Sequence, residues 1–200
     1  ERGAVALAGR EINYTHGAIN SLHGIHDELL DSVLTSERML ALASSLLGEP
    51  AVPRAVEIFA KPAQVGLPSP WHQDNAYWCA EPACGLTIWI ALDASDEKNG
   101  GLTYVPGSQR WGLQEHMPSF APGSSQRLAV LPPGDQITPS LQPGDALVHH
   151  CLTIHGSGPN TSARARRAVT LQYVGQSVRY DHEKRHAYEA SLEAQVRGRA

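Results

Sequence analysis

The stretch LTIWIAL at residues 86–92 decides the fold class of this chain. Its bulky aliphatic residues recur at every second position, so in an extended strand their side chains share one face. Thr87, Trp89 and Ala91 then share the opposite face. The stretch is also rich in the β-branched and aromatic residues that favour strands. It therefore predicts a β-strand with two faces of different composition.

Further short strand candidates lie on both sides of this stretch. Loops rich in Gly, Pro and Ser separate them, as in the turn at residues 143–145. The candidates are residues 56–60, 102–105, 127–131, 146–153 and 168–175. Many short strands punctuated in this way predict a mainly β sandwich or barrel.

Helical periodicity is clearest in residues 27–47. Apolar residues recur there at helical spacing, and the sequence TSE at residues 35–37 predicts a break with a new N-cap. Gly48 and Pro50 supply a stop signal. We therefore expect two short helices that flank the β-structure.

The two ends of the chain are less informative. Residues 181–197 predict a charged, solvated terminal helix, whereas residues 1–26 are too weakly patterned to predict any structure. No second core is visible, so we expect residues 1–200 to form one domain. The chain starts at Glu1 and not at Met, which leaves open that residues precede it.

The composition excludes several function classes. Asp and Glu number 20 against 16 Lys and Arg, a net charge of −4, which argues against a nucleic-acid or anionic-membrane partner. Hydrophobic residues make up 42%, enough for a globular core, and no apolar run approaches the ~20 residues that cross a bilayer. The three cysteines show no CxxC spacing, so they predict no disulfide framework and favour a cytoplasmic protein.

The sequence WHQD at residues 71–74 contains the first chemical motif. In an extended strand, His72 and Asp74 point to the same side and can reach a common ion. One imidazole and one carboxylate are two of the three ligands of the 2-His-1-carboxylate triad, which leaves positions open on Fe(II). The motif by itself is weak evidence for a metal site.

A third ligand should come from a later strand, and residues 144–157 offer three histidines. If this segment stays extended, His149 and His155 face one way and His150 faces the other. A position near the end of the strand, where small molecules enter, favours His155. His149 is the alternative ligand on the same face, and His150 is expected to be structural.

The basic stretch ARARRAVTLQY at residues 163–173 carries a further candidate. Taken alone it predicts a solvated basic turn. In the strand that follows, however, Arg166 shares the small and polar face with Thr170 and Gln172. If the opposite face packs under helices, this face lines the interior, where a buried Arg needs an anion such as a dicarboxylic acid.

Five stretches together carry a resemblance to a known family, and they span about half of the chain. The chain resembles the phytanoyl-CoA dioxygenase family of Fe(II)- and 2-oxoglutarate-dependent oxygenases. The matching stretches are WHQDNAYW (71–78), TIWIALD (87–93), NGGLTYVPGSQRWG (99–112), PGDALVHHCLTIHGSGPN (143–160) and RARRAVTLQY (164–173).

The resemblance implies a fold and a set of site residues. The fold is a double-stranded β-helix, a jelly-roll barrel related to cupins, with flanking helices. The implied metal ligands are His72, Asp74 and His155. The implied 2-oxoglutarate anchor is Arg166, eleven residues after the last ligand, assisted by Ser157. Among the aromatic residues, Trp89 and Tyr77 are candidates to border the cosubstrate pocket, although core packing is the commoner role.

The resemblance also implies an activity. A small organic substrate is oxidised at an unactivated C–H bond by dioxygen, with 2-oxoglutarate converted to succinate and CO₂, and ascorbate supports such reactions in vitro. Related halogenases carry Gly or Ala at the carboxylate position, so Asp74 favours hydroxylation or desaturation over halogenation. Two alternatives stay open, namely a cupin-like metalloenzyme that does not use 2-oxoglutarate, with Arg166 at the surface, and a non-catalytic jelly-roll ligand-binding module.

Overall fold

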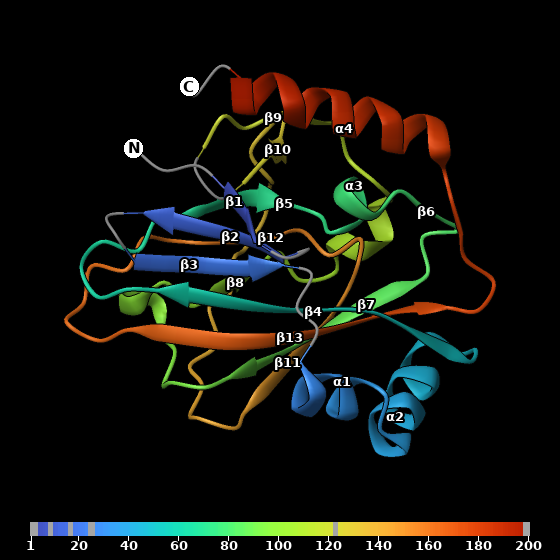
Figure 1. Cartoon of the computed structure of the whole chain (residues 1–200), viewed down its shortest axis with the longest axis horizontal. Helices are drawn as coiled ribbons and strands as arrows, with labels where there is room; N and C mark the ends of the chain where they lie inside the picture. Colours follow the sequence, from blue (N-terminus) through green and yellow to red (C-terminus); the bar gives the residue numbers. More distant parts are fainter. Residues whose placement is uncertain (1–3, 8–9, 16–17, 24–26, 122–123, 198–200) are drawn as a thin grey trace.

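The computed structural model describes residues 4–7, 10–15, 18–23, 27–121 and 124–197 (Figure 1). The chain is mainly β, with four α-helices and two short 3-10 helices in these residues. The strands are β1 Ala4–Leu7, β2 Arg10–Thr15, β3 Ala18–His23, β4 Ala51–Lys61, β5 Ser69–His72, β6 Ala80–Glu81, β7 Gly85–Ala91, β8 Leu102–Tyr104, β9 His116–Pro118, β10 Gln126–Leu128, β11 Ala146–His150, β12 His155–Ser157, β13 Arg166–Gly175 and β14 Arg179–Tyr180. The helices are α1 Glu28–Leu34, α2 Glu37–Leu47, α3 Asn75–Trp78, α4 His182–Arg197, η1 Glu97–Asn99 and η2 Ser108–Trp111.

Two antiparallel sheets form the barrel. The large sheet has the strand order β1-β2-β3-β4-β13-β7-β11, and the small sheet has the order β5-β12-β8. The sheets face each other, because Thr87 of β7 and His149 of β11 both contact the carboxylate of Asp74, which follows β5. The predicted double-stranded β-helix with flanking helices is therefore confirmed.

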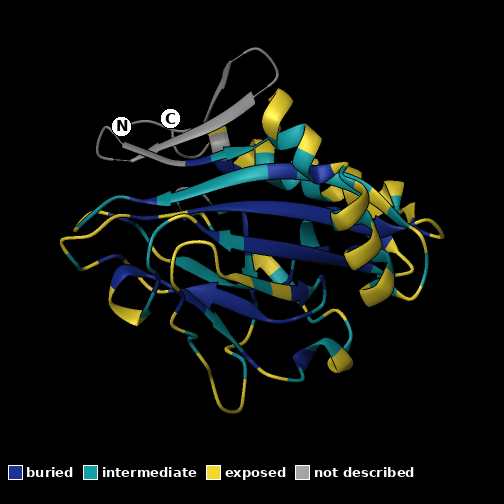
Figure 2. Ribbon diagram, turned by 90° about the horizontal axis from the view of Figure 1, so that it is seen from below, coloured by how far each residue is buried: buried dark blue, intermediate teal, exposed yellow. Residues whose placement is uncertain are grey.

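The outer face of the large sheet forms the main core with the first two helices. Leu171 and Tyr173 of β13 are fully buried there, and they pack with Leu34 of α1 and Ala43 of α2. The Tyr173 hydroxyl donates a hydrogen bond to the Leu34 carbonyl at 2.8 Å, so the buried phenol is satisfied. Figure 2 shows the central strands as the buried part of the molecule, with exposed residues concentrated on helices and loops.

The helical part of the chain matches its sequence signals. Asp27 caps α1 by accepting hydrogen bonds from two backbone N–H groups, and Ser36 caps α2 in the same way through Met39. Gly48 ends α2 at a φ of 76°, which is the left-handed conformation that favours glycine at this position. The predicted pair of helices and its stop signal are confirmed.

The N-terminal part of the chain is structured where the sequence predicted nothing. Strands β1, β2 and β3 pair antiparallel and extend the large sheet beside β4. Backbone hydrogen bonds to neighbouring strands stabilise β1, β2 and β3, so the alternation of their side chains predicts them poorly. Strand β4 is also longer than the predicted residues 56–60, because Pro53 lies at a register shift opposite Tyr173, where a proline is tolerated.

The segment that carries three histidines is not one extended strand, and the strand predicted at residues 146–153 is shorter than expected. Strand β11 ends at His150, and the chain turns before β12 begins at His155. Two local hydrogen bonds make the turn: Thr153 N–H donates to the His150 carbonyl, and Leu152 N–H donates to His150 Nδ1. The turn moves the chain from the large sheet to the small sheet.

The C-terminal helix is present as predicted. Helix α4 lies across the end of the molecule beside β9 and β10 (Figure 1). Tyr188 and Gln195 of this helix hydrogen-bond to Ser125. In the described ranges, no helix is long and apolar enough to cross a membrane.

Candidate metal and cosubstrate site

Three side chains with metal-ligating atoms meet inside the barrel. His72 ends β5, Asp74 directly precedes α3, and His155 begins β12, where it lies opposite His72 in the strand pairing. Asp74 Oδ1 lies 3.9 Å from His72 Nε2 and 3.5 Å from His155 Nε2. The ligand atoms of the three residues all lie within 4.8 Å of one another.

The route by which the sequence brings His72 and Asp74 together differs from the predicted one. Strand β5 ends at His72, and Asp74 has helical backbone angles, with φ −56° and ψ −35°. The N–H groups of Tyr77 and Trp78 both donate to the Asp74 carbonyl, which closes the first turn of α3. The direction of the Asp74 side chain is therefore set by the junction between β5 and α3. It is not set by the alternation of side chains in an extended strand.

Backbone carbonyls fix the tautomers of the two histidines. His72 Nδ1 lies 2.7 Å from the Pro70 carbonyl, and His155 Nδ1 lies 3.0 Å from the Thr153 carbonyl. Because a carbonyl only accepts, both Nδ1 atoms carry the proton and both Nε2 lone pairs face Asp74. Burial lowers the pKa of each imidazole, most strongly that of His155, and so favours the neutral form that binds metals.

One oxygen of Asp74 is already occupied. Thr87 Oγ1 donates to Oδ2 at 2.7 Å, and His149 Nε2 lies 3.2 Å from the same atom. Because the carboxylate accepts, His149 Nε2 carries the proton, and its Nδ1 accepts from the Tyr104 hydroxyl at 3.0 Å. Burial alone would raise the pKa of Asp74, but the hydrogen bond from His149 acts in the opposite direction, and the pKa stays below its ordinary value. Asp74 Oδ1 accepts no hydrogen bond from Thr87 or His149 and can therefore bind a metal ion.

The other sequence candidates near the three residues have distinct places. His149, the alternative ligand, lies beside the triad and supports Asp74. His150 is structural, as predicted, since its Nδ1 accepts from the Leu152 N–H. Tyr77 borders the site, with its ring 5.5 Å from that of His72 in an edge-on arrangement.

Arg166 lies on the inner face of β13, as the strand alternation predicted. It is 2% exposed, its Nε donates to the Gly100 carbonyl at 3.1 Å, and its guanidinium lies 5.3 Å from the centre of the Trp89 ring. In the part of the chain that the structure describes, three buried side-chain atoms have no hydrogen-bond partner, namely Arg166 Nη1, Ser157 Oγ and Ser95 Oγ. Buried donors of this kind are costly unless something fills the place of the partner.

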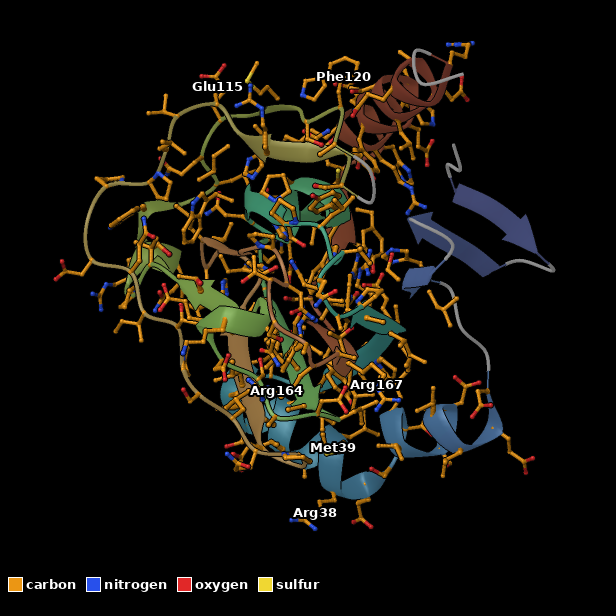
Figure 3. The ribbon with its side chains drawn as sticks, turned by 90° about the vertical axis from the view of Figure 1, so that its left-hand side faces the viewer. Arg38, Met39, Glu115, Phe120, Arg164 and Arg167 are labelled. Carbon is orange, nitrogen blue, oxygen red and sulfur yellow. The ribbon has the colours of Figure 1, made fainter. Side chains whose placement is uncertain are left out.

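The neighbouring arginines are different. Arg164 and Arg167, both labelled in Figure 3, are exposed and form ion pairs with Asp96 and Asp93 at 2.6 and 2.8 Å. Each of them already has a carboxylate partner at the surface. Arg166 is thus the arginine of this stretch whose surroundings suit a buried anion.

Lys61 is a buried amine near the site, and it was not among the residues predicted from the sequence. It lies opposite Arg166 in the pairing of β4 with β13, and its Nζ donates to the Leu67 and Gly158 carbonyls at 2.6 and 2.7 Å. Burial, with a contribution from Arg166, lowers the pKa of Lys61 to about 6. In the sequence, only strand alternation could have indicated that Lys61 points inward: it lies two residues after Phe59, so the two side chains share the inner face of β4.

The residues present fit a metal ion and a dicarboxylate. Ligand atoms that lie ~2.0–2.2 Å from one ion are at most about 4.3 Å apart, and both distances from Asp74 Oδ1 are shorter than that. Two neutral imidazoles and one carboxylate are the donor set of non-haem Fe(II) sites with open positions. A carboxylate would supply the missing partner for both Arg166 and Ser157.

A jelly-roll barrel with this donor set and a buried arginine defines the class of non-haem iron oxygenases. The family model described as "Phytanoyl-CoA dioxygenase (PhyH)" matches residues 5–168. The chain belongs to the phytanoyl-CoA dioxygenase family, a family of 2-oxoglutarate-dependent dioxygenases, as the sequence resemblance predicted.

Individual relatives agree with this assignment. The chain is 32% identical over 183 residues to an L-proline trans-4-hydroxylase of Streptomyces griseoviridis, covering 78% of this chain and 67% of that protein. It is 32% identical over 158 residues to a probable alpha-ketoglutarate-dependent hypophosphite dioxygenase of Stutzerimonas stutzeri, covering 75% of this chain and 54% of that protein. The chain thus spans between about half and two thirds of these relatives.

A solved structure shares the fold over most of the chain. The crystal structure of EvdO2 from Micromonospora carbonacea superimposes with a TM-score of 0.71 at 26% sequence identity, covering 89% of this chain and 75% of that one. The barrel and its flanking helices are therefore those of a known oxygenase fold.

Proposed function

We propose that this chain is an Fe(II)- and 2-oxoglutarate-dependent dioxygenase that oxidises an unactivated C–H bond of a small organic molecule. The observation that carries the proposal is the coexistence, in one barrel, of the His-Asp-His group with two buried donors that lack a partner, Arg166 Nη1 and Ser157 Oγ. A metal site alone would not need those two donors.

The three ligating residues would hold Fe(II) through His72 Nε2, Asp74 Oδ1 and His155 Nε2. The Nδ1–H bonds of the two histidines to backbone carbonyls keep both rings in the orientation that binding needs. Thr87 and His149 hold Asp74 Oδ2 and so direct Oδ1 toward the metal. A bound iron would supply the activation of dioxygen, which ordinary side chains cannot supply.

Arg166 and Ser157 would bind the distal carboxylate of 2-oxoglutarate. The guanidinium is already oriented by the Gly100 carbonyl and by the Trp89 ring, so little conformational entropy is lost on binding. Trp89 therefore supports the arginine in this proposal. The alternative of a metalloenzyme that does not use 2-oxoglutarate requires Arg166 at the surface, and the structure buries it.

The relatives support a small-molecule substrate, since their names specify L-proline and hypophosphite as the compounds they act on. We also propose a cytoplasmic location, which the three free cysteine thiols support. The test is succinate release from purified protein given Fe(II), 2-oxoglutarate and ascorbate. The proposal predicts release that stops in His72→Ala, and release that persists in this variant would refute it.

A further inference from the structure

A second polar group lies on the inner face of the large sheet, apart from the residues used above. We call Arg54, Glu57 and Gln172 the Arg54 cluster. The Arg54 guanidinium donates a short hydrogen bond through Nη1 to Gln172 Oε1, and Gln172 Nε2 donates to Glu57 Oε2 at 2.9 Å. The Gln172 amide thus connects a cationic side chain to an anionic one.

The Arg54 cluster lies next to the metal-binding carboxylate. Gln172 of β13 is directly opposite Thr87 of β7, and the two side chains share the inner face. The Thr87 hydroxyl is the group that donates to Asp74 Oδ2 at 2.7 Å. A molecule bound against Asp74 on this side would therefore meet Gln172 and the two charged residues that it connects.

Arg54 is held ready to bind an anion. Its guanidinium stacks on the ring of the buried Trp78, 4.5 Å from the ring centre, and such stacking fixes the plane of the donors. The side chain is only half-buried, and among the described residues no carboxylate lies within 4.0 Å of it. A guanidinium has five N–H donors, of which the bond to Gln172 uses one.

Glu57 supplies the opposite charge a short distance away. Its Oε2 accepts from Gln172, and its Oε1 lies 3.0 Å from His23 Nδ1. Glu57 keeps partial exposure, with 18% of its side chain accessible. The cluster therefore presents a cation and an anion on the two sides of one amide group.

We propose that the Arg54 cluster is the substrate subsite and that the substrate is an α-amino acid. The substrate carboxylate pairs with Arg54 and its ammonium pairs with Glu57. In an α-amino acid the carboxylate and the ammonium are attached to the same carbon, and in the cluster the two charged side chains contact the oxygen and the nitrogen of one amide group. A substrate with only one charge would make only one of the two ion pairs and would therefore bind more weakly. This inference rests on the proposed dioxygenase function.

The test is anaerobic calorimetric titration of the protein loaded with Fe(II) and 2-oxoglutarate. Each of the standard L-amino acids is the titrant, followed by the amine-free acid and the carboxylate-free amine that correspond to the tightest binder. At least one amino acid should bind, and both single-charge analogues should bind on the order of 10-fold or more weaker.

Variants of Arg54 and Glu57 test which residue binds the carboxylate and which binds the ammonium of the amino acid. Arg54→Ala should weaken the binding of the amino acid by about 10- to 100-fold, and Arg54→Lys should weaken it less. Glu57→Gln should weaken the binding of the amino acid and leave that of the amine-free acid nearly unchanged. The control is Arg38→Ala, whose side chain points away from the body of the protein on α2 (Figure 3); this variant should bind like the wild type.

Two results would overturn the inference. One is that no amino acid binds to protein that takes up Fe(II) and 2-oxoglutarate normally. The other is that folded Arg54→Ala and Arg54→Lys, with unchanged thermal midpoints, bind the amino acid as the wild type does. A wild type that takes up neither Fe(II) nor 2-oxoglutarate refutes the dioxygenase proposal instead, and the same titrations on the metal-free protein then decide whether the cluster binds amino acids.

Discussion

The two faces of strand β13 differ in what they bury. On the outer face, Leu171 and Tyr173 pack against the helices with no exposed surface. On the inner face, Arg166, Thr170 and Gln172 are almost as deeply buried, yet they are polar or charged. The outer face stabilises the fold through apolar burial. The inner face holds groups whose burial is costly unless partners are supplied, and one of those partners, at Arg166, is missing.

Alternate residues of one strand thus serve stability and function separately. The division should be visible in mutants: changes on the inner face should alter binding with small effects on stability, and changes on the outer face should do the opposite.

Removal of any proposed metal ligand should have the largest effect. Ala at His72, Asp74 or His155 takes away one of three ligands, so succinate release should fall to background while far-ultraviolet circular dichroism stays unchanged. His150→Ala is the control and should retain activity, because its ring makes a local contact in the turn. Activity retained in His155→Ala and lost in His149→Ala would mean that His149 is the third ligand.

The outer face should show its effect in stability. Leu171→Ala removes a fully buried side chain and should lower the free energy of unfolding by about 2–5 kcal/mol in denaturant titrations. The apparent KM for 2-oxoglutarate of the folded protein should not change. Val148→Ala, on a strand of the same sheet but with 45% of the residue exposed, should change stability by no more than ~0.5 kcal/mol. Equal losses in the two variants would contradict the packing described for this face.

Arg166 should affect binding of the cosubstrate. Each charge-assisted hydrogen bond to a carboxylate is worth about 1.5–3 kcal/mol, so Arg166→Ala should raise the apparent KM for 2-oxoglutarate by on the order of 10²-fold. Fe(II) affinity should stay nearly constant, and Arg166→Lys should restore part of the loss. Arg167→Ala, which removes an exposed ion pair with Asp93, should raise this KM no more than a few-fold. A reversed order of the two alanine variants would show that Arg166 is not the anchor.

Lys61 should make stability depend on pH. Its pKa is about 6 in the folded protein and 10.5 when unperturbed, so between these values the unfolded chain binds one more proton. The free energy of unfolding should therefore rise with pH across this window, by up to about 1.4 kcal/mol per pH unit, and Lys61 should add no pH dependence below about 6, where it is protonated in both states. Urea titrations at several pH values should give a shallower slope for Lys61→Met. Parallel curves for the two proteins would rule out a depressed pKa.

The sequence predicted the regions in which side chains alternate or recur regularly. The alternation in residues 168–173 assigned both faces of β13, and the caps at Ser36 and Gly48 bounded α2. The motif at His72 and Asp74 predicted two side chains that do lie close together, although the backbone between them is not extended. The residue types and their spacing were sufficient to predict that these two side chains meet, even though the predicted extended backbone was wrong.

Other parts could not be predicted because their cause is not local. Strand β3 pairs with β4, and β2 and β1 follow it in the sheet through backbone pairing that no side-chain pattern indicates. The inward direction of Arg54 accompanies the register shift between Gln172 and Tyr173, which interrupts the regular alternation of β4. The turn between β11 and β12 separates His149 from His155, and it depends on which sheet each segment joins.

The most direct test of the central claim is an anaerobic titration of the metal-free protein with Fe(II) and 2-oxoglutarate, followed by visible absorption of the chelate. We expect one chelate per chain in the wild type, none in Asp74→Ala, and one in Arg166→Ala only at much higher 2-oxoglutarate concentration. A wild type that binds Fe(II) but forms no chelate, or an Arg166→Ala titration that coincides with the wild type, would contradict it.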